Sequence, residues 1–247
     1  TSNVKLGVNA GNSIASGGNF NVVVGDEAGT AITTGDQNTA VGFSSLVANT
    51  TGGNNVALGR KALFTNTTGG SNVALGLNAL FNNTTASNNT SVGNSSLFAN
   101  TTGTRNVAVG TSALNANTVG GKNVALGMDA LGTNIDGSRS VAVGDSALAT
   151  QEPASAVDMY NVAVGHGAGA AVTTGVQNTL IGGLAGDALT VGQENVALGY
   201  NSLTLDTKGS HSVAIGSHAL LQQNFSSATN SFNVAIGSSA GQQVTTG

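Results

Sequence analysis

The chain has 247 residues, of which 7% are charged and 4% aromatic, and it contains 37 glycines but neither cysteine nor tryptophan. Its net charge of -4, with seven scattered Lys and Arg residues, excludes a basic stripe for nucleic acid, and the lack of cysteine excludes disulfides and thiolate metal sites. No apolar segment reaches the roughly 20 residues of a membrane helix, so we expect no membrane insertion. Small apolar residues are too frequent for a disordered chain, which favours a repetitive fold.

A short apolar run that ends in glycine recurs along the whole chain. Of the 13 spacings between these marker glycines, ten equal 17 residues, one is 18 and two are 21. Spacing this regular predicts a repeat architecture. The marker glycines are Gly7, Gly25, Gly42, Gly59, Gly76, Gly93, Gly110, Gly127, Gly144, Gly165, Gly182, Gly199, Gly216 and Gly237.

The residues before each marker glycine alternate like a strand. The preceding residue is always aliphatic, the next one back is Ala in ten copies, and the third is Val or Thr. The fourth is Asn in twelve copies, with Ser140 and Ser212 as the exceptions. This β-branched alternation, closed by T-T-G or T-G-G corners, predicts short strands joined by tight turns.

The residues after each marker glycine define two repeat types. The third is Ala or Ser, and the fourth is Leu in nine copies and Gly in five. Most Leu copies carry Asn seven residues after the marker, as at Asn66, whereas the Gly copies carry an aliphatic residue there, as at Ile32. We therefore expect each repeat to supply one large apolar side chain by one of two routes.

Seventeen residues are too few for a helical repeat, because helical solenoids use 33 residues or more. The chain is therefore predicted to be all-β, a parallel β-solenoid or β-roll of about 14 coils with a 17-residue period, forming a single domain over residues 1–247 cut from a longer protein. Coils spaced like strands, about 4.7–4.9 Å apart, predict a rod on the order of 65 Å long. Equivalent asparagines should form hydrogen-bonded ladders, and Phe64, Phe81 and Phe98 should stack as a column.

The Ala columns, of the Ala57 and Ala62 types, are small for a packing face. A small apolar face lets backbones approach closely, which favours packing of the chain against copies of itself. We therefore expect a homotrimer, either intertwined or side by side, in which Val and Leu fill each protomer and the Ala columns lie near the shared axis.

Two coils carry insertions, near residues 148–160 and 220–232. Insertions in a solenoid lie in loops on the outside, frequently on the binding face. Aromatic residues there are expected either to contact a receptor or to cover the ends of neighbouring strands. The residues predicted to contact a receptor are Tyr160, Met159, Phe225 and Phe232.

The stretch YNVAVGHGAGAAV, residues 160–172, fits the spacing G-x-G-x-x-A of a dinucleotide-binding loop. The residues of this stretch that the repeat determines are, however, those of an ordinary coil. The next strand begins by Asn178, which leaves no room for the crossover helix of a dinucleotide-binding fold. His166, His211 and His218 occupy variable positions without metal-site spacing. We therefore predict no enzyme, no cofactor and no metal site.

The coil N-V-A-L-G-R-K-A-L-F-T-N-T-T-G-G-S, residues 55–71, resembles the repeats of bacteriophage tail-fibre proteins and, more distantly, the head β-roll of trimeric autotransporter adhesins. The resemblance implies an extracellular trimeric rod, located on a virion or on a bacterial cell surface. The surface of this rod would bind a host glycan or protein receptor. The alternative functions are the head of a bacterial surface adhesin and, because Thr pairs such as Thr67-Thr68 repeat in register, an ice-binding solenoid.

Overall fold

A computed structural model of the protein describes residues 2–15 and 17–246. These residues contain strands, turns and bends but no helix. The chain divides into two compact units, Thr1–Gly121 and Lys122–Gly247, each of which is a parallel β-solenoid. The all-β solenoid class, the period of about 17 residues and the total of about 14 turns are therefore confirmed.

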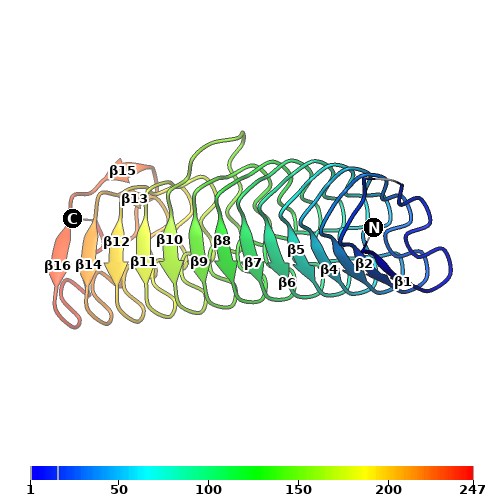
Figure 1. The fold of residues 1–247 in the computed structure, drawn as a ribbon. Coiled ribbons are helices and arrows are strands. Elements are labelled where there is room, and N and C mark those ends of the chain that lie inside the picture. The colour runs from blue at the N-terminus through cyan, green and yellow to red at the C-terminus, as the bar shows by residue number, and fades with distance from the viewer. Residues whose placement is uncertain (1, 16, 247) are drawn as a thin grey trace. The chain divides into compact units, whose positions relative to one another are not determined.

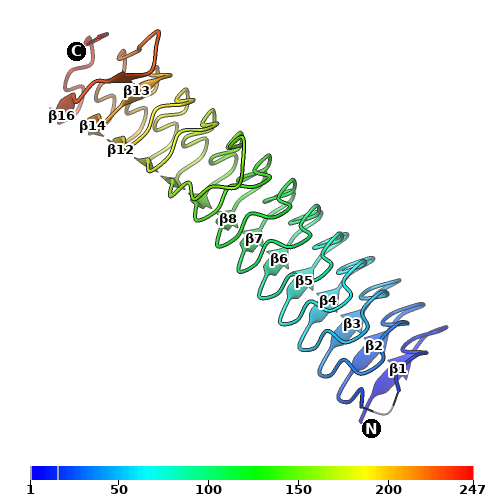
Figure 2. The same cartoon turned by 90° about the horizontal axis from the view of Figure 1, so that it is seen from above.

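The first unit forms one parallel sheet in which consecutive strands pair in sequence order (Figures 1 and 2). The register places equivalent residues opposite each other, so Ala57 of one coil faces Ala74 of the next. The strands are β1 (Val4–Leu6), β2 (Val22–Val24), β3 (Thr39–Val41), β4 (Val56–Leu58), β5 (Val73–Leu75), β6 (Thr90–Val92) and β7 (Val107–Val109).

The second unit repeats this arrangement and adds a small two-stranded sheet. The strands of its main sheet are β8 (Val124–Leu126), β9 (Val141–Val143), β10 (Val162–Val164), β11 (Thr179–Ile181), β12 (Val196–Leu198), β14 (Val213–Ile215) and β16 (Val234–Ile236). The small sheet pairs β13 (Gly209–Ser210) with β15 (Thr229–Asn230), which belongs to the second insertion.

The Ala columns lie inside each coil, so the prediction that they face a shared trimer axis was wrong. Ala57, Ala62 and Leu63 are fully buried, whereas Val56 is half-buried and Leu58 is 48% exposed. Each strand of the main sheets has only three residues, and in a coil such as that of β4 the middle side chain points into a narrow interior that the opposite wall already fills with Ala and Leu. In coils that also carry the interior Leu, only a small residue fits there, and the flanking Val and Leu side chains point outward.

The two repeat types fill the same interior space by different routes, as predicted. Gly29 takes the place of Leu in its coil, and a Cβ atom built on Gly29 lies 2.7 Å from Cγ1 of Val23 and 2.8 Å from Cδ1 of Ile32. The larger Val23 and Ile32 side chains therefore occupy the volume that Leu63 and its equivalents fill in other coils.

Non-glycine residues with left-handed backbone recur in every complete coil. Asn54, Lys61 and Leu63 have φ values of 60°, 57° and 51°. This conformation costs an L-residue roughly 1–2 kcal/mol, but it turns each N–H along the solenoid axis. The N–H of Lys61 donates to the Phe43 carbonyl at 3.0 Å, and that of Leu63 donates to the Ala79 carbonyl at 3.0 Å. The turns, like the strands, are thus hydrogen-bonded from coil to coil.

Two buried asparagine ladders run along the coils, as the sequence predicted. In the first ladder the N–H of Asn55 donates to Oδ1 of Asn38 at 3.0 Å, and in the second Nδ2 of Asn66 donates to Oδ1 of Asn49 at 2.8 Å. In a coil that carries both asparagines the two ladders also share one backbone acceptor, because Asn38 and Asn49 each donate Nδ2 to the Gly52 carbonyl at 2.9 Å. The amides therefore tie the strand to the opposite corner of its own coil.

The marker glycines stack directly on one another. Gly59 has φ +135°, and a Cβ atom there lies 2.5 Å from the carbonyl oxygen of Gly76. Gly237, in the last described coil, has φ +126°, but the nearest atom to its Cβ position is 3.9 Å away. Gly59 is therefore held by both conformation and contact, and Gly237 by conformation alone.

We predict that Gly59→Ala lowers the free energy of unfolding by roughly 4 kcal/mol or more, because steric overlap adds to backbone strain. Gly237→Ala, the matched control, should lose only the strain, about 1–3 kcal/mol. Urea unfolding of both variants measures the difference. Equal losses would contradict the proposed role of glycine stacking.

Candidate functional site

The residue five before each marker glycine forms a column of outward side chains on a fixed backbone, called here the display column. These residues are in the left-handed region, with φ values of 63° for Arg139, 52° for Tyr160 and 51° for Phe232. Their N–H groups bond along the axis, as Gln177 does to the Met159 carbonyl at 2.8 Å. In the second unit the display column consists of Lys122, Arg139, Tyr160, Gln177, Glu194, His211 and Phe232.

One charged and aromatic cluster lies where the first insertion returns to the display column. Nε of Arg139 lies 2.8 Å from Oδ1 of Asp158, and the Arg139 guanidinium lies 5.6 Å from the centre of the Tyr160 ring. The Tyr160 hydroxyl lies 3.4 Å from Oδ2 of Asp158. All three side chains are substantially exposed, so the cluster presents a cation, an anion and a ring to solvent.

A second cluster follows in the same column. Nε2 of His211 lies 3.4 Å from Oε2 of Glu194, and the rings of His211 and Phe232 have centroids 5.0 Å apart. Phe232 is 66% exposed. The second unit therefore displays two clusters, each with one exposed aromatic ring beside charged or ionisable groups.

The two insertions depart from the same corner of their coils, immediately before the display column. The first rises as an exposed loop over residues 154–158 (Figure 1) and returns through hydrogen bonds at 2.9 Å between Ser138 N–H and the Val157 carbonyl and between Met159 N–H and the Ser138 carbonyl. The second lies along the coils, where β15 pairs with β13. These loops flank the display column and extend its surface.

The predicted receptor contacts fall into two classes. Tyr160 and Phe232 are exposed members of the display column. Met159 is fully buried and Phe225 is only 8% exposed, so these two side chains, unlike Tyr160 and Phe232, do not form part of the exposed surface. An apolar side chain at the base of a loop gains more by filling the coil interior than by facing water.

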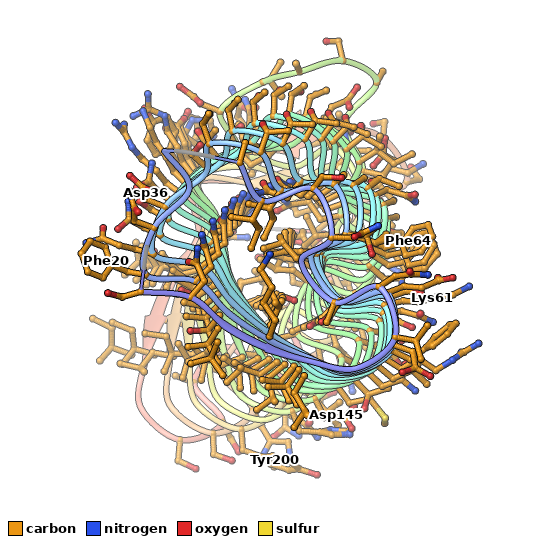
Figure 3. All side chains as sticks on the ribbon, turned by 45° about the vertical axis from the view of Figure 1, so that its right-hand side comes forward. Phe20, Asp36, Lys61, Phe64, Asp145 and Tyr200 are labelled. Atoms are coloured by element: carbon orange, nitrogen blue, oxygen red, sulfur yellow. The ribbon has the colours of Figure 1, made fainter. Side chains whose placement is uncertain are left out.

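The outer sheet face, defined by the side chains three and one before each marker glycine, is an apolar surface in each unit. Figure 3 shows the side chains standing out from the ribbon around the coils. In the first unit Leu58 and Val109 are 48% and 37% exposed, and in the second unit Ile181 and Leu198 are 36% and 43% exposed. Contiguous apolar surface of this kind is typical of interaction sites.

Phe64, Phe81 and Phe98 stack as predicted. Their ring centroids are 4.8 and 5.2 Å apart with interplanar angles of 10° and 18°. Nζ of Lys61 lies 5.2 Å from the centre of the Phe64 ring, and both residues point out of the coil in Figure 3. Because the ring faces are taken up by one another, the column stabilises successive coils.

The threonine pairs divide their roles. Oγ1 of Thr50 donates to the Thr67 carbonyl at 3.1 Å, and Oγ1 of Thr67 donates to the Thr84 carbonyl at 3.1 Å. The following Thr51 and Thr68 are exposed. Each pair therefore contributes one outward hydroxyl, and the pairs together form a single column. An ice-binding face is expected to present two such columns side by side.

The histidines lie apart from one another. His166 is exposed, whereas the half-buried His218 meets the edge of the Tyr200 ring with centroids 5.7 Å apart. Within residues 2–15 and 17–246, no three His, Asp or Glu side chains gather closely enough to hold a metal ion. The part of the chain that the structure describes also contains no helix long and apolar enough to cross a membrane.

Comparison of the chain with protein-family models, with curated proteins and with solved structures found no match.

Burial raises the pKa of the Glu152 carboxyl above its ordinary value, although Ile135 N–H donates to Oε2 at 2.6 Å and lowers it; nearby Asp136 adds to the rise. A raised pKa in the folded state means that protonated Glu152 favours folding at low pH and that this contribution is lost as pH rises through the folded pKa.

We predict that Glu152→Gln, which keeps a hydrogen-bond acceptor for Ile135, slightly raises the melting temperature at pH 7. The gain should vanish below about pH 4, where the natural side chain is protonated. Calorimetry at both pH values measures the difference between the two proteins. A gain that is the same at both pH values would contradict the assignment.

Proposed function

We propose that this chain is a structural and receptor-binding segment of a homotrimeric extracellular fibre, most simply a phage tail fibre that attaches to a host cell surface. The observation that carries the proposal is the outer sheet face, where β-branched and aliphatic side chains stay exposed along each unit. A fibre made of one chain needs such a face to pack against its copies.

The burial of the Ala columns inside the coil supports this assignment of faces. The Ala side chains are used up inside the coil, so the outer sheet face is the apolar surface left for partner chains. A three-fold axis parallel to the solenoid lets each protomer bury this face against two copies while equivalent coils stay level. The strand spacing is then the same in all three chains.

The receptor-binding part of the proposal rests on the display column and insertions of the second unit. An exposed ring beside paired charges offers stacking and directional hydrogen bonds together, which suits a host glycan or a protein surface. Tyr160 and Phe232 supply the rings, and Arg139, Asp158 and Glu194 supply the charges. No catalytic step is part of the proposal.

We predict that Leu58→Lys combined with Leu75→Lys converts the trimer to a monomer, because the buried face then carries unpaired charges. Thr68→Lys combined with Thr85→Lys, at exposed threonines, is the matched control and should remain trimeric. Sedimentation equilibrium gives the masses. A monomeric mass for the natural protein would overturn the trimer.

We predict that Tyr160→Ala combined with Phe232→Ala weakens attachment to host cells about tenfold or more, the scale of aromatic hot spots. The control is Phe20→Ala, because Phe20 is 63% exposed in the display column of the first unit, whose coils carry neither of the two insertions. Flow cytometry with labelled protein measures attachment. An equal effect of all three substitutions, or none, would contradict a receptor site at the insertions.

A further inference from the structure

The two asparagine ladders depend on one carbonyl in each regular coil. Asn55 and Asn66 both donate to the Gly69 carbonyl at 2.9 Å, as Asn38 and Asn49 do to that of Gly52. The acceptor is the residue ten after the marker glycine, at the corner that leads to the display column. Whatever changes the chain path at this corner removes the shared acceptor of two buried amides.

Both 21-residue coils change the path at this corner. The residues ten after their marker glycines are Ala154 and Ser226, and both lie in the exposed parts of the insertions. Asparagines at the two ladder positions of these coils would keep buried amides without their usual acceptor. An unsatisfied buried polar group is costly, so the coil needs another solution.

In the first insertion the solution is Ser140 with Gln151. Oγ of Ser140 donates a hydrogen bond to Oε1 of Gln151 at 3.0 Å. The Gln151 Oε1 atom also accepts a hydrogen bond from Nδ2 of Asn161 at 2.9 Å. Nε2 of Gln151 continues the second ladder by donating to Oδ1 of Asn134 at 2.9 Å. A residue shorter than Asn in the first ladder and one longer than Asn in the second therefore bond to each other, and neither needs the lost carbonyl.

The second insertion repeats the solution at the same spacing. Nε2 of Gln223 donates to Oγ of Ser212 at 2.9 Å and to Oδ2 of Asp206 at 2.6 Å. Oε1 of Gln223 accepts Nδ2 of Asn233 at 2.7 Å. In both coils Gln follows Ser by 11 positions and precedes Asn by 10, whereas a regular coil such as that of Asn55, Asn66 and Asn72 has Asn in all three places, 11 and 6 positions apart.

Each insertion also closes the coil interior with an apolar side chain of its own. Cγ of Met159 lies 3.1 Å from the Cβ position of Gly137, and Cδ2 of Phe225 lies 2.9 Å from that of Gly209. The base of each loop is thus fixed by polar and apolar contacts, while residues 154–158 and 226–228 are exposed.

We infer that the pattern S-x10-Q-x9-N marks a loop-insertion module. The Ser140–Gln151 pair and the Ser212–Gln223 pair are its positioning residues, and the loops that they hold determine specificity. The loops are residues 152–160 and 224–232. The recognition part rests on the proposed receptor-binding function, whereas the positioning part rests on the hydrogen bonds alone. The module holds each loop at its base and leaves the exposed segment free to differ between chains with different receptors.

The test exchanges the residue pair in two coil lengths. One background is the natural protein, and the other has residues 152–160 replaced by Thr-Thr-Gly-Gly-Ser, the segment that follows Asn66 in a regular coil. Ser140→Asn combined with Gln151→Asn is made in both, and urea unfolding midpoints are compared. The asparagine pair should lower the midpoint in the 21-residue coil and raise it in the 17-residue coil.

A shift of the same sign in both backgrounds would overturn the module, because the pair would then act independently of the insertion. If the natural background no longer folds with the asparagine pair, Gln223→Asn combined with Ser212→Asn gives the same comparison at the second insertion. The matched control is Asn55→Ser combined with Asn66→Gln in a regular coil, which should lower the midpoint.

Attachment to host cells separates the two parts of the inference. The shortened, asparagine-paired coil keeps the solenoid but lacks the first loop, and its attachment should fall about tenfold or more. Unchanged attachment together with the expected reversal of sign would overturn the recognition role of this loop and leave the positioning role intact. Lost attachment without the reversal of sign would overturn the positioning role and leave the receptor site intact.

Discussion

Hydrogen bonding along the solenoid axis is the constraint on which the rest of this structure depends. Neighbouring coils lie about one strand spacing apart, so each residue has its own equivalent above and below it. Only three residues per coil are in the main strand, so the backbone N–H and C=O groups of the turns must also find hydrogen-bond partners. They do so by adopting left-handed backbone at residues such as Lys61 and Leu63, whose N–H groups then point to the preceding coil and to the following coil, respectively.

The same constraint explains which features the sequence predicts well. A residue type that recurs every 17 positions must stack on itself, so the glycine stack, both asparagine ladders and the Phe64–Phe81–Phe98 column follow from spacing alone. The exchange of Leu for Gly also follows, because the aliphatic residue seven after the marker appears in the same copies. Because equivalent residues of neighbouring coils stack, these contacts can be predicted from the period without knowing the handedness of the solenoid.

Spacing does not say which way a column faces, and the errors in prediction have this origin. A small residue suits a narrow coil interior as well as a close contact between chains, so the sequence leaves both places open for Ala57 and Ala62. The structure buries Ala57 as the middle residue of its strand and Ala62 in the turn that follows. The buried Met159 and Phe225 show that an insertion adds residues to the coil interior as well as to the exposed loop. The signal for the anchored loops was present: Ser140 and Ser212 are the exceptions to the asparagine rule, and they occur in the two 21-residue coils.

The position of the insertions follows from what each part of a coil loses when the chain lengthens. In the strand and in the turn after the marker glycine, an added residue shifts axial hydrogen bonds and the stacked glycines out of register. At the corner after the second ladder, the essential loss is one carbonyl that accepts two amides. A serine and a glutamine that bond to each other replace it, as at Ser140 and Gln151. This corner therefore tolerates inserted residues. Because it borders the display column, the least constrained part of the coil adjoins the surface whose residues vary most from coil to coil.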